Sequence, residues 1–303
     1  MKSPPTKVLE YFSLPQTGWQ EPLHRGAVAK TWVGEKYVLQ ARPIQFVDRS
    51  LMLHKLAGEV DIQGLKFHGP AIVEEANGEV SEAISGACGD RVWDVQPRLY
   101  EVKSLFHPGM EDMELIQNAD LVLSGVLEQL SGFALQVDQH QLFCQYDTPG
   151  IAIQKASPQT LKQFCRQTCP LPTSPADHLS EEKPESPLVC SHGDAIIKNT
   201  LLTTDGVCMI DWEAATVLPR HMDLAHMTVF LCKYAESHYW CYILDQHWEK
   251  VQAFLPGWDS QDWYLACAWY FVRELVAFQP SDPKVALRCW AGLADFVHLL
   301  KNA

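Results

Sequence analysis

Three polar residues between positions 191 and 215 are of the types that bind a divalent cation and a phosphate. Asp194 and Asn199 precede one short apolar run, and Asp211 follows a second one. The dipeptide Asp205-Gly206 separates the two runs and is the strongest short hairpin signal in the chain. Because a hairpin brings its two ends together, we expect the three polar groups to converge. Carboxylate and amide oxygens suit a hard divalent cation and the phosphates it carries.

The composition is that of an ordinary globular protein, with 47% hydrophobic and 20% charged residues among 303. A chain of this length can bury a sizeable core, and we expect two lobes. The net charge of −13 argues against nucleic acid as the main partner, because phosphate backbones are bound by basic patches.

The sequence gives no sign of a secretory or membrane segment. Its first 15 residues lack the apolar core of a signal peptide. The most apolar long run, 263–278, contains Arg273 and Glu274, so we expect a buried helix there and no membrane contact. Ten cysteines are scattered without a Cys-x-x-Cys pair, which indicates buried thiols in a reducing compartment. We therefore expect a cytoplasmic protein.

The first 97 residues predict a small, mostly antiparallel sheet with one main helix. Strands are indicated by β-branched and aromatic runs bounded by turn residues: 27–33, 36–42, 71–75, 80–84 and 91–96. The last of these alternates in hydrophobicity, which predicts a half-buried strand, and Pro97 ends it. Apolar spacing predicts a short helix over 8–12 and a longer one over 45–57, which begins near Asp48 and ends at Gly58.

Beyond Pro97 the pattern is helical except for the hairpin at 200–211. Apolar periodicity predicts helices at 111–132, 158–168, 222–235, 237–254, 260–278 and 282–301. The stretch 170–187 carries five prolines and a charge run, which predicts a surface loop. A small sheet followed by a larger helical part indicates an α+β fold.

A spaced set of short motifs runs through the hairpin region. It consists of His192-Gly193-Asp194, Asn199, Ile210-Asp211-Trp212-Glu213 and Met222-Asp223-Leu224-Ala225. This set resembles the aminoglycoside phosphotransferase and choline kinase superfamily, over most of the chain from Gly26 onward. The resemblance implies a protein-kinase-like bilobal fold. Its small antiparallel sheet would form a nucleotide-binding lobe over 1–97, and a larger, mainly helical lobe over 98–303 would hold the catalytic and acceptor residues.

The resemblance implies roles for the three polar residues. Asp194 matches the catalytic base, which orients the acceptor hydroxyl or takes its proton. Asn199 and Asp211 match the residues that hold Mg²⁺ against the phosphates of ATP. Two protein ligands suffice, because Mg²⁺ keeps several waters and phosphate oxygens in its coordination shell.

Three further residues are expected to support this loop. In related folds the histidine at His192 packs and forms hydrogen bonds under the loop, so we expect a structural role for it. Asp223 resembles the superfamily's buried acid, which steadies the loop through hydrogen bonds. Glu213 either reaches the metal or holds the loop, and the sequence leaves both roles open.

The phosphate-binding strand departs from the superfamily pattern. The family form Tyr-Val-Leu-Lys or Tyr-Val-Leu-Arg falls on 37–40, where the neutral Gln40 replaces the cation. Strand alternation places Arg42 on the same face, from which it could reach back to the phosphates. The expected helix 45–57 has Arg49 and no glutamate partner for that cation. Arg42 and Arg49 are therefore either replacements for the usual ion pair or solvated surface charges.

Other nucleotide contacts are expected from the backbone. The segment Gln96-Pro97-Arg98-Leu99 would present main-chain groups to adenine. The loop 23–27 would cover the phosphates, with Gly26 permitting close approach.

These residues predict an ATP-dependent, Mg²⁺-requiring phosphotransferase that moves the γ-phosphate to a hydroxyl of a small molecule, such as an aminoglycoside or an amino alcohol. Acidic helices would suit a cationic acceptor, whereas Lys198 would suit an anionic one. The aromatic-rich helices from 237 to 278 would wall the acceptor pocket. The alternative is a degenerate kinase fold that senses nucleotides or binds proteins, which the missing cation at Gln40 favours.

Overall fold

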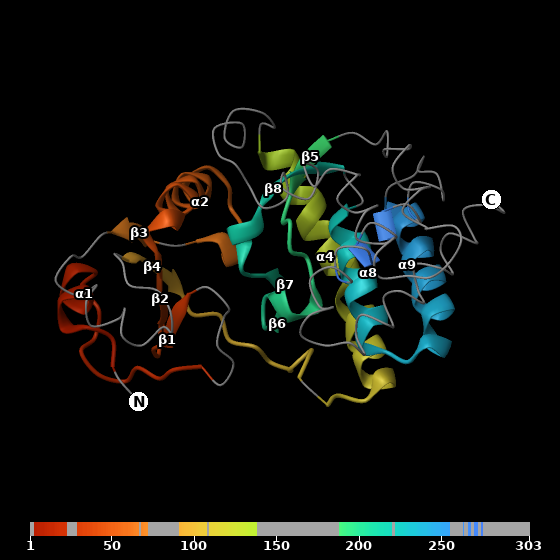
Figure 1. Ribbon diagram of the computed structural model, residues 1–303, viewed down its shortest axis with the longest axis horizontal. Helices are drawn as coiled ribbons and strands as arrows, with labels where there is room; N and C mark the ends of the chain where they lie inside the picture. The colour runs from red at the N-terminus through yellow and green to blue at the C-terminus, as the bar shows by residue number, and fades with distance from the viewer. Residues whose placement is uncertain are drawn as a thin grey trace, which may run out of the picture. The chain divides into compact units, whose positions relative to one another are not determined.

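The computed structural model describes 3–22, 29–66, 68–71, 91–107, 109–137, 188–219, 222–254 and six positions from Trp263 to Glu274. The described residues form two compact units, one within the first 100 residues and one from Glu101 onward. Strands dominate the first unit and helices the second, so the α+β prediction is confirmed (Figure 1).

The first unit is built on a four-stranded antiparallel sheet (Figure 1). Its strands, in spatial order, are β1 (Lys30–Val33), β2 (Tyr37–Pro43), β4 (Arg91–Pro97) and β3 (His68–Ala71). The β1–β2 pairing confirms the first predicted hairpin. Two helices accompany the sheet, α1 (Thr6–Tyr11) and α2 (Val47–Glu59), the latter packed against β3 and β4.

Strand β4 is buried on both faces, so the prediction of a half-buried strand is wrong. Its first five residues are all buried. Trp93 and Val95 join the core cluster that contains Val8 and Leu9 of α1. Asp94, between them, points the other way and accepts a hydrogen bond from Ser50 of α2 at 3.3 Å. Helices from two parts of the chain therefore cover the two faces.

Two predicted boundaries in this unit change. Helix α2 continues through Gly58 to Glu59, and Val60 closes it with a bond from its backbone N–H to Leu56. The prediction that Gly58 ends the helix is therefore wrong, because nothing there requires a left-handed residue. Strand β3 ends at Ala71, and the remainder of the predicted 71–84 hairpin lies outside the described residues.

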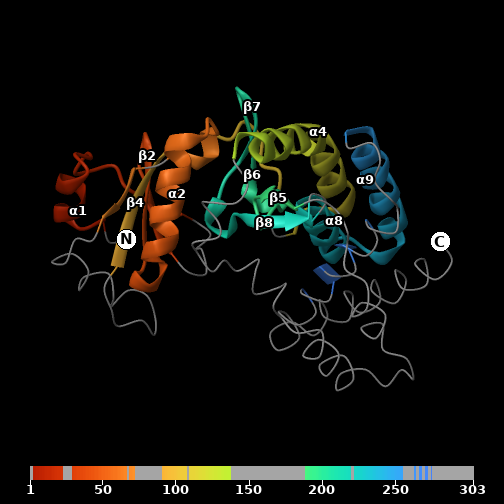
Figure 2. The ribbon, with the colours of Figure 1, turned by 90° about the horizontal axis from the view of Figure 1, so that it is seen from above.

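The second unit combines helices with two short ladders. Its main helices are α4 (Asp112–Gln136), α8 (Met222–Tyr234) and α9 (Trp240–Phe254), with the short turn η5 (Ser237–Tyr239) before α9. Helix α8 contacts both α4 and α9, and its residues from Met222 to Lys233 are all buried (Figure 2). It is therefore the central helix of this unit.

The predicted helices agree with these elements in place. Helix α4 runs past Gly132, where the prediction ended, to Gln136. The six described positions from Trp263 to Glu274 are helical, in agreement with the predicted helix at 260–278. The predicted helices at 158–168 and 282–301 and the loop at 170–187 lie outside the described residues. Among the helices that the structure describes, none is long and apolar enough to cross a membrane.

The hairpin in this unit is confirmed, with a shifted turn. Strands β6 (Thr200–Thr203) and β7 (Gly206–Met209) pair antiparallel, and Thr203 faces Gly206. The two-residue loop is thus Thr204-Asp205, and Gly206 opens the return strand with φ of +113°. A second ladder, β5 (Leu188–Ser191) with β8 (Thr216–Pro219), was not predicted. The expectation that only one hairpin interrupts the helices is therefore wrong.

A buried histidine between α8 and α9 makes the stability of the fold depend on pH. His247 Nδ1 lies 2.6 Å from Thr228 Oγ1, and burial, with a smaller effect of Lys250, lowers the pKa of His247 to about 3. The folded state keeps this ring neutral, whereas the unfolded chain binds a proton below about pH 6.5. The contribution of the neutral His247 ring to stability is therefore complete above pH 6.5 and is lost as the pH falls towards 3.

We expect His247→Asn to flatten the decline of unfolding free energy between pH 6.5 and 4, by up to about 1.4 kcal/mol per pH unit. Asparagine retains a donor near Thr228 but has no proton to gain. Urea titrations at a series of pH values measure this slope. The matched control is His238→Asn at an exposed histidine of η5, which should leave the slope unchanged. Equal slopes in wild type and His247→Asn would contradict this assignment.

Candidate active site

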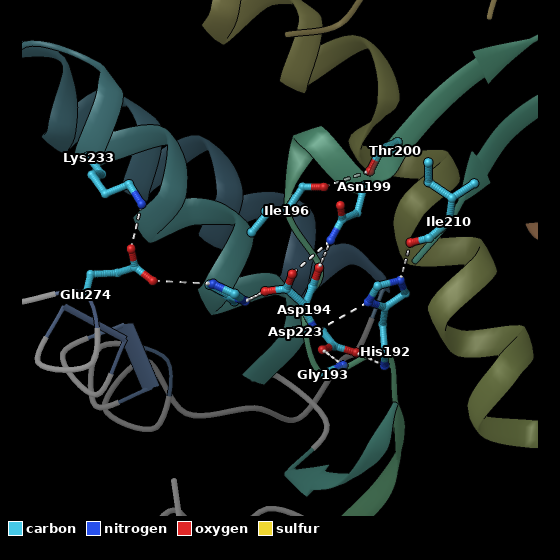
Figure 3. A network of polar contacts seen from close by, with 11 residues as sticks. His192, Gly193, Asp194, Ile196, Asn199, Thr200, Ile210, Asp223, Lys233 and Glu274 are labelled. Atoms are coloured by element: carbon cyan, nitrogen blue, oxygen red, sulfur yellow. Dashed lines mark hydrogen bonds and ion pairs between the residues drawn. The ribbon is translucent and has the colours of Figure 1, made fainter. Parts of the chain in front are cut away.

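Asp223, in the first turn of α8, anchors the backbone of the loop that follows β5. Its carboxylate accepts hydrogen bonds from the backbone N–H groups of His192 at 2.6 Å and Gly193 at 2.8 Å (Figure 3). Burial raises the pKa of Asp223 to about 7, although these two N–H donors oppose the rise. The structure therefore places Asp223 beneath the loop, where it determines the course of the chain into Asp194.

Gly193 is required at its position for two reasons. Its φ of +78° belongs to the left-handed region that favours glycine. A Cβ atom at this position would also overlap the carbonyl oxygen of Ala214. The loop after β5 and the segment after β7 thus touch backbone to backbone at Gly193.

His192 links the same two segments through its ring. Its Nε2 lies 2.8 Å from the carbonyl oxygen of Ile210, and its Nδ1 accepts the backbone N–H of Asp194 at 3.3 Å (Figure 3). The ring lies against Trp212, with centroids 4.5 Å apart. Burial lowers the pKa of His192 to about 4, although its contacts with Ile210 and Asp194 oppose the change. The neutral ring donates from Nε2 and accepts at Nδ1, which suits a structural role.

Asp194 and Asn199 form a fixed pair. The short turn η3 (Ile197–Asn199) returns the chain so that Asn199 Nδ2 donates to the backbone oxygen and to Oδ2 of Asp194, both at 2.9 Å (Figure 3). Asn199 is buried, whereas the Asp194 side chain is 31% exposed. The asparagine thus orients a carboxylate that solvent and small molecules can reach. Because Asn199 Nδ2 donates to Asp194, Asn199 Oδ1 is the atom of this side chain that can face a cation.

Asp211 stands at the exit of the hairpin, next to the residue that pairs with Asn199. The backbone N–H of Ile210 donates to the Asn199 carbonyl at 2.8 Å. Asp211 itself adopts a left-handed conformation, with φ of 64° and ψ of 51°, which is uncommon for a residue other than glycine. Its side chain is exposed. The hairpin therefore brings the segments of Asn199 and Asp211 side by side, as its two ends predicted.

Glu213 and Lys198 flank this centre. Glu213 is half-buried in the short turn η4 (Trp212–Ala214), and both of its expected roles stay predictions. Lys198 Nζ lies 4.9, 5.3 and 5.4 Å from the ring centroids of Phe106, Phe230 and Tyr234. Burial lowers the pKa of Lys198 against the opposing charges nearby. The ammonium is thus held by cation–π contacts, and its contact with an acceptor stays a prediction.

In the first unit, Gln40 and Arg42 share one face of β2, as strand alternation predicted. Arg42 forms a buried ion pair with Asp94 of β4 and donates to Gln40 Oε1 at 2.6 Å. Gln96 donates to the same oxygen at 3.3 Å. The interpretation of Arg42 and Arg49 as solvated charges is wrong. They are only 4% and 9% exposed.

Asp94, the partner of Arg42, was not predicted from the sequence. The family pattern places a glutamate on the helix, but here the carboxylate comes from β4, and Ser50 of α2 donates a hydrogen bond to it. The available signal was a charged residue inside the otherwise apolar run Val92-Trp93-Asp94-Val95. A buried acid in such a run requires a cationic partner.

Arg98 forms hydrogen bonds and a ring contact within the first unit. Its backbone N–H donates to Lys36 at 2.8 Å, and its side chain donates to the Gly34 carbonyl at 2.9 Å and lies over Tyr100. An adenine contact from 96–99 must therefore use other main-chain groups, such as those of the half-buried Leu99. Gly26 lies outside the described residues.

The buried ion pair predicts a large stability effect. We expect Asp94→Ala to lower the free energy of unfolding by about 3–5 kcal/mol, because it leaves the Arg42 charge buried without its carboxylate. The matched control is Asp61→Ala, which removes a surface ion pair to Lys66 (2.7 Å, with Asp61 88% exposed) in the same unit. Chemical denaturation should detect little change for the control. Similar denaturation midpoints for Asp94→Ala and Asp61→Ala would contradict the stabilising role of the buried Arg42–Asp94 pair.

Part of the chain matches a known protein family, and its fold is similar to those of solved structures. Residues 141–264 match the sequence model of the Phosphotransferase enzyme family. No curated protein is significantly similar in sequence. Among solved structures, a choline/ethanolamine kinase family protein from Mesorhizobium loti has a TM-score of 0.53 and 13% identity, covering 98% of this chain and 99% of that one. An aminoglycoside phosphotransferase from Alicyclobacillus acidocaldarius has a TM-score of 0.54 and 16% identity, with coverage of 95% and 92%.

A third structure, a thermostable mutant of an aminoglycoside phosphotransferase in ternary complex with ADP and hygromycin B, has a TM-score of 0.58. It is 16% identical, and the match covers 97% of this chain and 97% of that one. At these identities the structural similarity shows the fold alone, and the family model matches 141–264, less than half of the chain. The chain therefore has the protein-kinase-like fold of these solved phosphotransferases and kinases, as its motifs predicted.

Proposed function

We propose that this protein is an ATP-dependent, Mg²⁺-requiring phosphotransferase that phosphorylates a hydroxyl of a small molecule. The observation that carries the proposal is the fixed pair of Asp194 and Asn199, on a loop whose backbone Asp223 holds. A part-exposed carboxylate with a defined orientation is the group that such a reaction needs.

Asp194 acts on the acceptor. In the proposed step the acceptor oxygen bonds to the γ-phosphorus, and the bond from that phosphorus to the bridging oxygen of the nucleotide breaks. The hydroxyl proton passes to the Asp194 carboxylate. Positioning provides much of the rate in phosphoryl transfer, so the contacts that fix Asp194 are as important as its basicity.

Asn199 and Asp211 would hold the metal. An amide oxygen and an exposed carboxylate are hard oxygen donors, which fit Mg²⁺. Among the described residues, no group of three or more His, Cys, Asp and Glu side chains could hold a metal alone. This donor set suits a cation that phosphate oxygens and water complete. When bound, Mg²⁺ neutralises charge on the phosphates.

The first unit is proposed to bind the nucleotide. Arg42 would supply the positive charge that Gln40 lacks, in a position that Asp94 and Gln40 fix. Gly26, Gln96, Arg98 and Leu99 stay in the proposal as contributors to the phosphate and adenine contacts. Similar folds have been solved with ADP and hygromycin B and with GDP and kanamycin. They support a nucleotide and a small acceptor carrying hydroxyl groups, such as an aminoglycoside or an amino alcohol.

The proposed location is the cytoplasm. Among the described residues, Cys190, Cys208, Cys232 and Cys267 are buried, which suits structural thiols of a reducing compartment.

The second candidate is a degenerate module that binds nucleotides or proteins without transferring phosphate, and Gln40 favours it. Thermal-shift titration with Mg·ATP separates the two. A kinase should be stabilised, by about 2.7 kcal/mol at 100 times Kd, and should slowly hydrolyse ATP. Asp211→Asn should lose the Mg²⁺-dependent part of the shift. No stabilisation of wild type by Mg·ATP would favour the degenerate module, as would stabilisation without any ATP turnover.

A further inference from the structure

A buried row of titratable side chains lies behind Asp194. His226 of α8 places Nδ1 3.6 Å from Asp194 Oδ1 and Nε2 3.8 Å from Glu274 Oε1. Glu274 Oε2 in turn lies 2.6 Å from Lys233 Nζ. Figure 3 shows Asp194, Glu274 and Lys233 within this one network. His226, Lys233 and Glu274 were not predicted as site residues from the sequence.

Helical spacing explains why α8 can supply both supports of the loop. Asp223 and His226 are three residues apart, and such residues lie on the same face of a helix. Asp223 binds the loop backbone, and His226 faces the Asp194 side chain one turn later. Lys233 follows seven residues after His226, again on that face. One helix thus holds the backbone and the side chain of the proposed base.

The row is buried and its charges are paired. His226, Lys233 and Glu274 are 2%, 3% and 6% exposed. Burial alone would raise the pKa of Glu274, but contacts with His226 and Lys233 outweigh it and lower that pKa to about 2. Glu274 is therefore ionised at neutral pH, and a carboxylate stands at each ring nitrogen of His226. Flanking carboxylates favour the charged imidazolium.

The surroundings also fix the plane of the His226 ring. Tyr270 stacks on it, with centroids 4.3 Å apart and planes 4° from parallel. Among the described residues, the titratable groups near His226 include Asp194 and His192 from the loop and Glu274 and Tyr270 from the helical positions at 263–274, and Lys233 of α8 pairs with Glu274. The His226 ring therefore has a defined orientation towards Asp194.

We propose that His226 is a positioning residue for Asp194, with Glu274 and Lys233 fixing its charge and orientation. The inference rests on the proposed function, because Asp194 is the base only in that reaction. Asn199 holds Oδ2 of Asp194 and His226 faces Oδ1, so both oxygens have a fixed neighbour. Each carboxylate oxygen has a second lone pair, which leaves room for the acceptor hydroxyl. At 3.6 Å the contact is an ion pair and not a hydrogen bond, so it depends on the charge of His226.

The kinetic test uses His226→Phe, which keeps a ring to stack on Tyr270 and removes the charge. We expect kcat to fall by about 10–100-fold, the range for residues that orient a functional group, with KM for ATP and acceptor unchanged. In an Asp194→Asn background the same substitution should have no further effect, because His226 acts through Asp194. An equal fold-loss in both backgrounds would show a general structural role and overturn the proposal.

The matched control is His247→Phe. This buried histidine contacts Thr228 of α8, outside the loop, so the variant should lose stability while kcat is retained. A similar loss of kcat in this control would show that any disturbance of the α8 packing lowers activity. That result would also overturn the assignment to His226.

A second readout does not depend on turnover. Nitrogen-15 spectra of the imidazole rings in the full-length protein at pH 7 should show His226 with protons on both nitrogens. Asp194→Asn should shift its Nδ1 signal, and Glu274→Gln its Nε2 signal. A neutral His226 ring, or His226 signals that do not shift in Asp194→Asn, would overturn the inference even for an active kinase. The expected spectra with no transfer to any acceptor would instead place the failure in the proposed function.

Discussion

Replacing Asp194 with asparagine is expected to lower kcat by about 10³-fold, while binding of Mg·ATP is retained. The amide keeps the size of the side chain and an oxygen that Asn199 can contact, but it cannot take the proton of the acceptor hydroxyl. General-base catalysis contributes about 10²–10⁴-fold, which sets the size of the loss. Steady-state kinetics with an acceptor that the wild type phosphorylates measure this loss of kcat. A thermal-shift titration with Mg·ATP tests whether the fold and nucleotide binding are retained.

Asp205→Asn is the matched control for this prediction. It makes the same chemical change on an exposed turn residue of the same hairpin, so its kcat should equal that of wild type. Turnover by Asp194→Asn at the wild-type rate would remove Asp194 from the mechanism. Loss of Mg·ATP binding in that variant would instead assign it to the nucleotide site.

Gly193→Ala is expected to have the largest structural effect of any single methyl addition in the loop. The new Cβ would meet the Ala214 carbonyl oxygen, and the backbone would have to leave its left-handed conformation. Either movement breaks the hydrogen bond from Gly193 to Asp223 and displaces Asp194. We expect activity below about 1% of wild type, since small misplacements of a catalytic group can cost about 10²-fold, and a clear loss of thermal stability.

Gly206→Ala is the control for this variant. Gly206 also has a positive φ, but a Cβ there meets nothing within 4 Å. Gly206→Ala should therefore lower the free energy of unfolding by only about 1–2 kcal/mol, the cost of a left-handed conformation for a residue with a Cβ, and should keep its kcat. Equal activities for the two alanine variants would show that the contact at Ala214 does not position the loop.

The centre of the candidate site could be predicted because its signals are local. Asn199 follows Asp194 by a single short turn, and Gly206 marks the hairpin that returns the chain to Asp211. Each step is encoded within a few residues. The turn was nevertheless misplaced by one residue, because Gly206 takes its positive φ as the first residue of β7 and not inside the loop.

The parts that could not be predicted depend on contacts between distant segments. The β5–β8 ladder joins two four-residue strands on either side of the hairpin, and strands that short carry little periodicity. Burial of Arg42 follows from α1 and α2 covering opposite faces of the sheet, which no pattern within β2 reveals. The approach of Glu274 to His226 is of the same kind.

Strand β2 shows how a departure from a family pattern can be interpreted too simply. Gln40 suggested that the usual ion pair was lost. The structure shows a buried ion pair moved by two residues along β2, with its acid on β4 in place of the helix. Gln40 now accepts hydrogen bonds from Arg42 and Gln96 and so belongs to the same cluster. This arrangement weakens the main argument for a degenerate module.

The most direct test of the central claim is an ATP-consumption screen of wild type and Asp194→Asn against a panel of amines, sugars and aminoglycosides. Mass spectrometry identifies any phosphorylated product. We predict at least one acceptor for which wild type produces ADP and a phosphorylated hydroxyl compound in equal amounts, and for which Asp194→Asn produces neither at a comparable rate. A blank across the whole panel for a wild-type protein that binds Mg·ATP would contradict the claim.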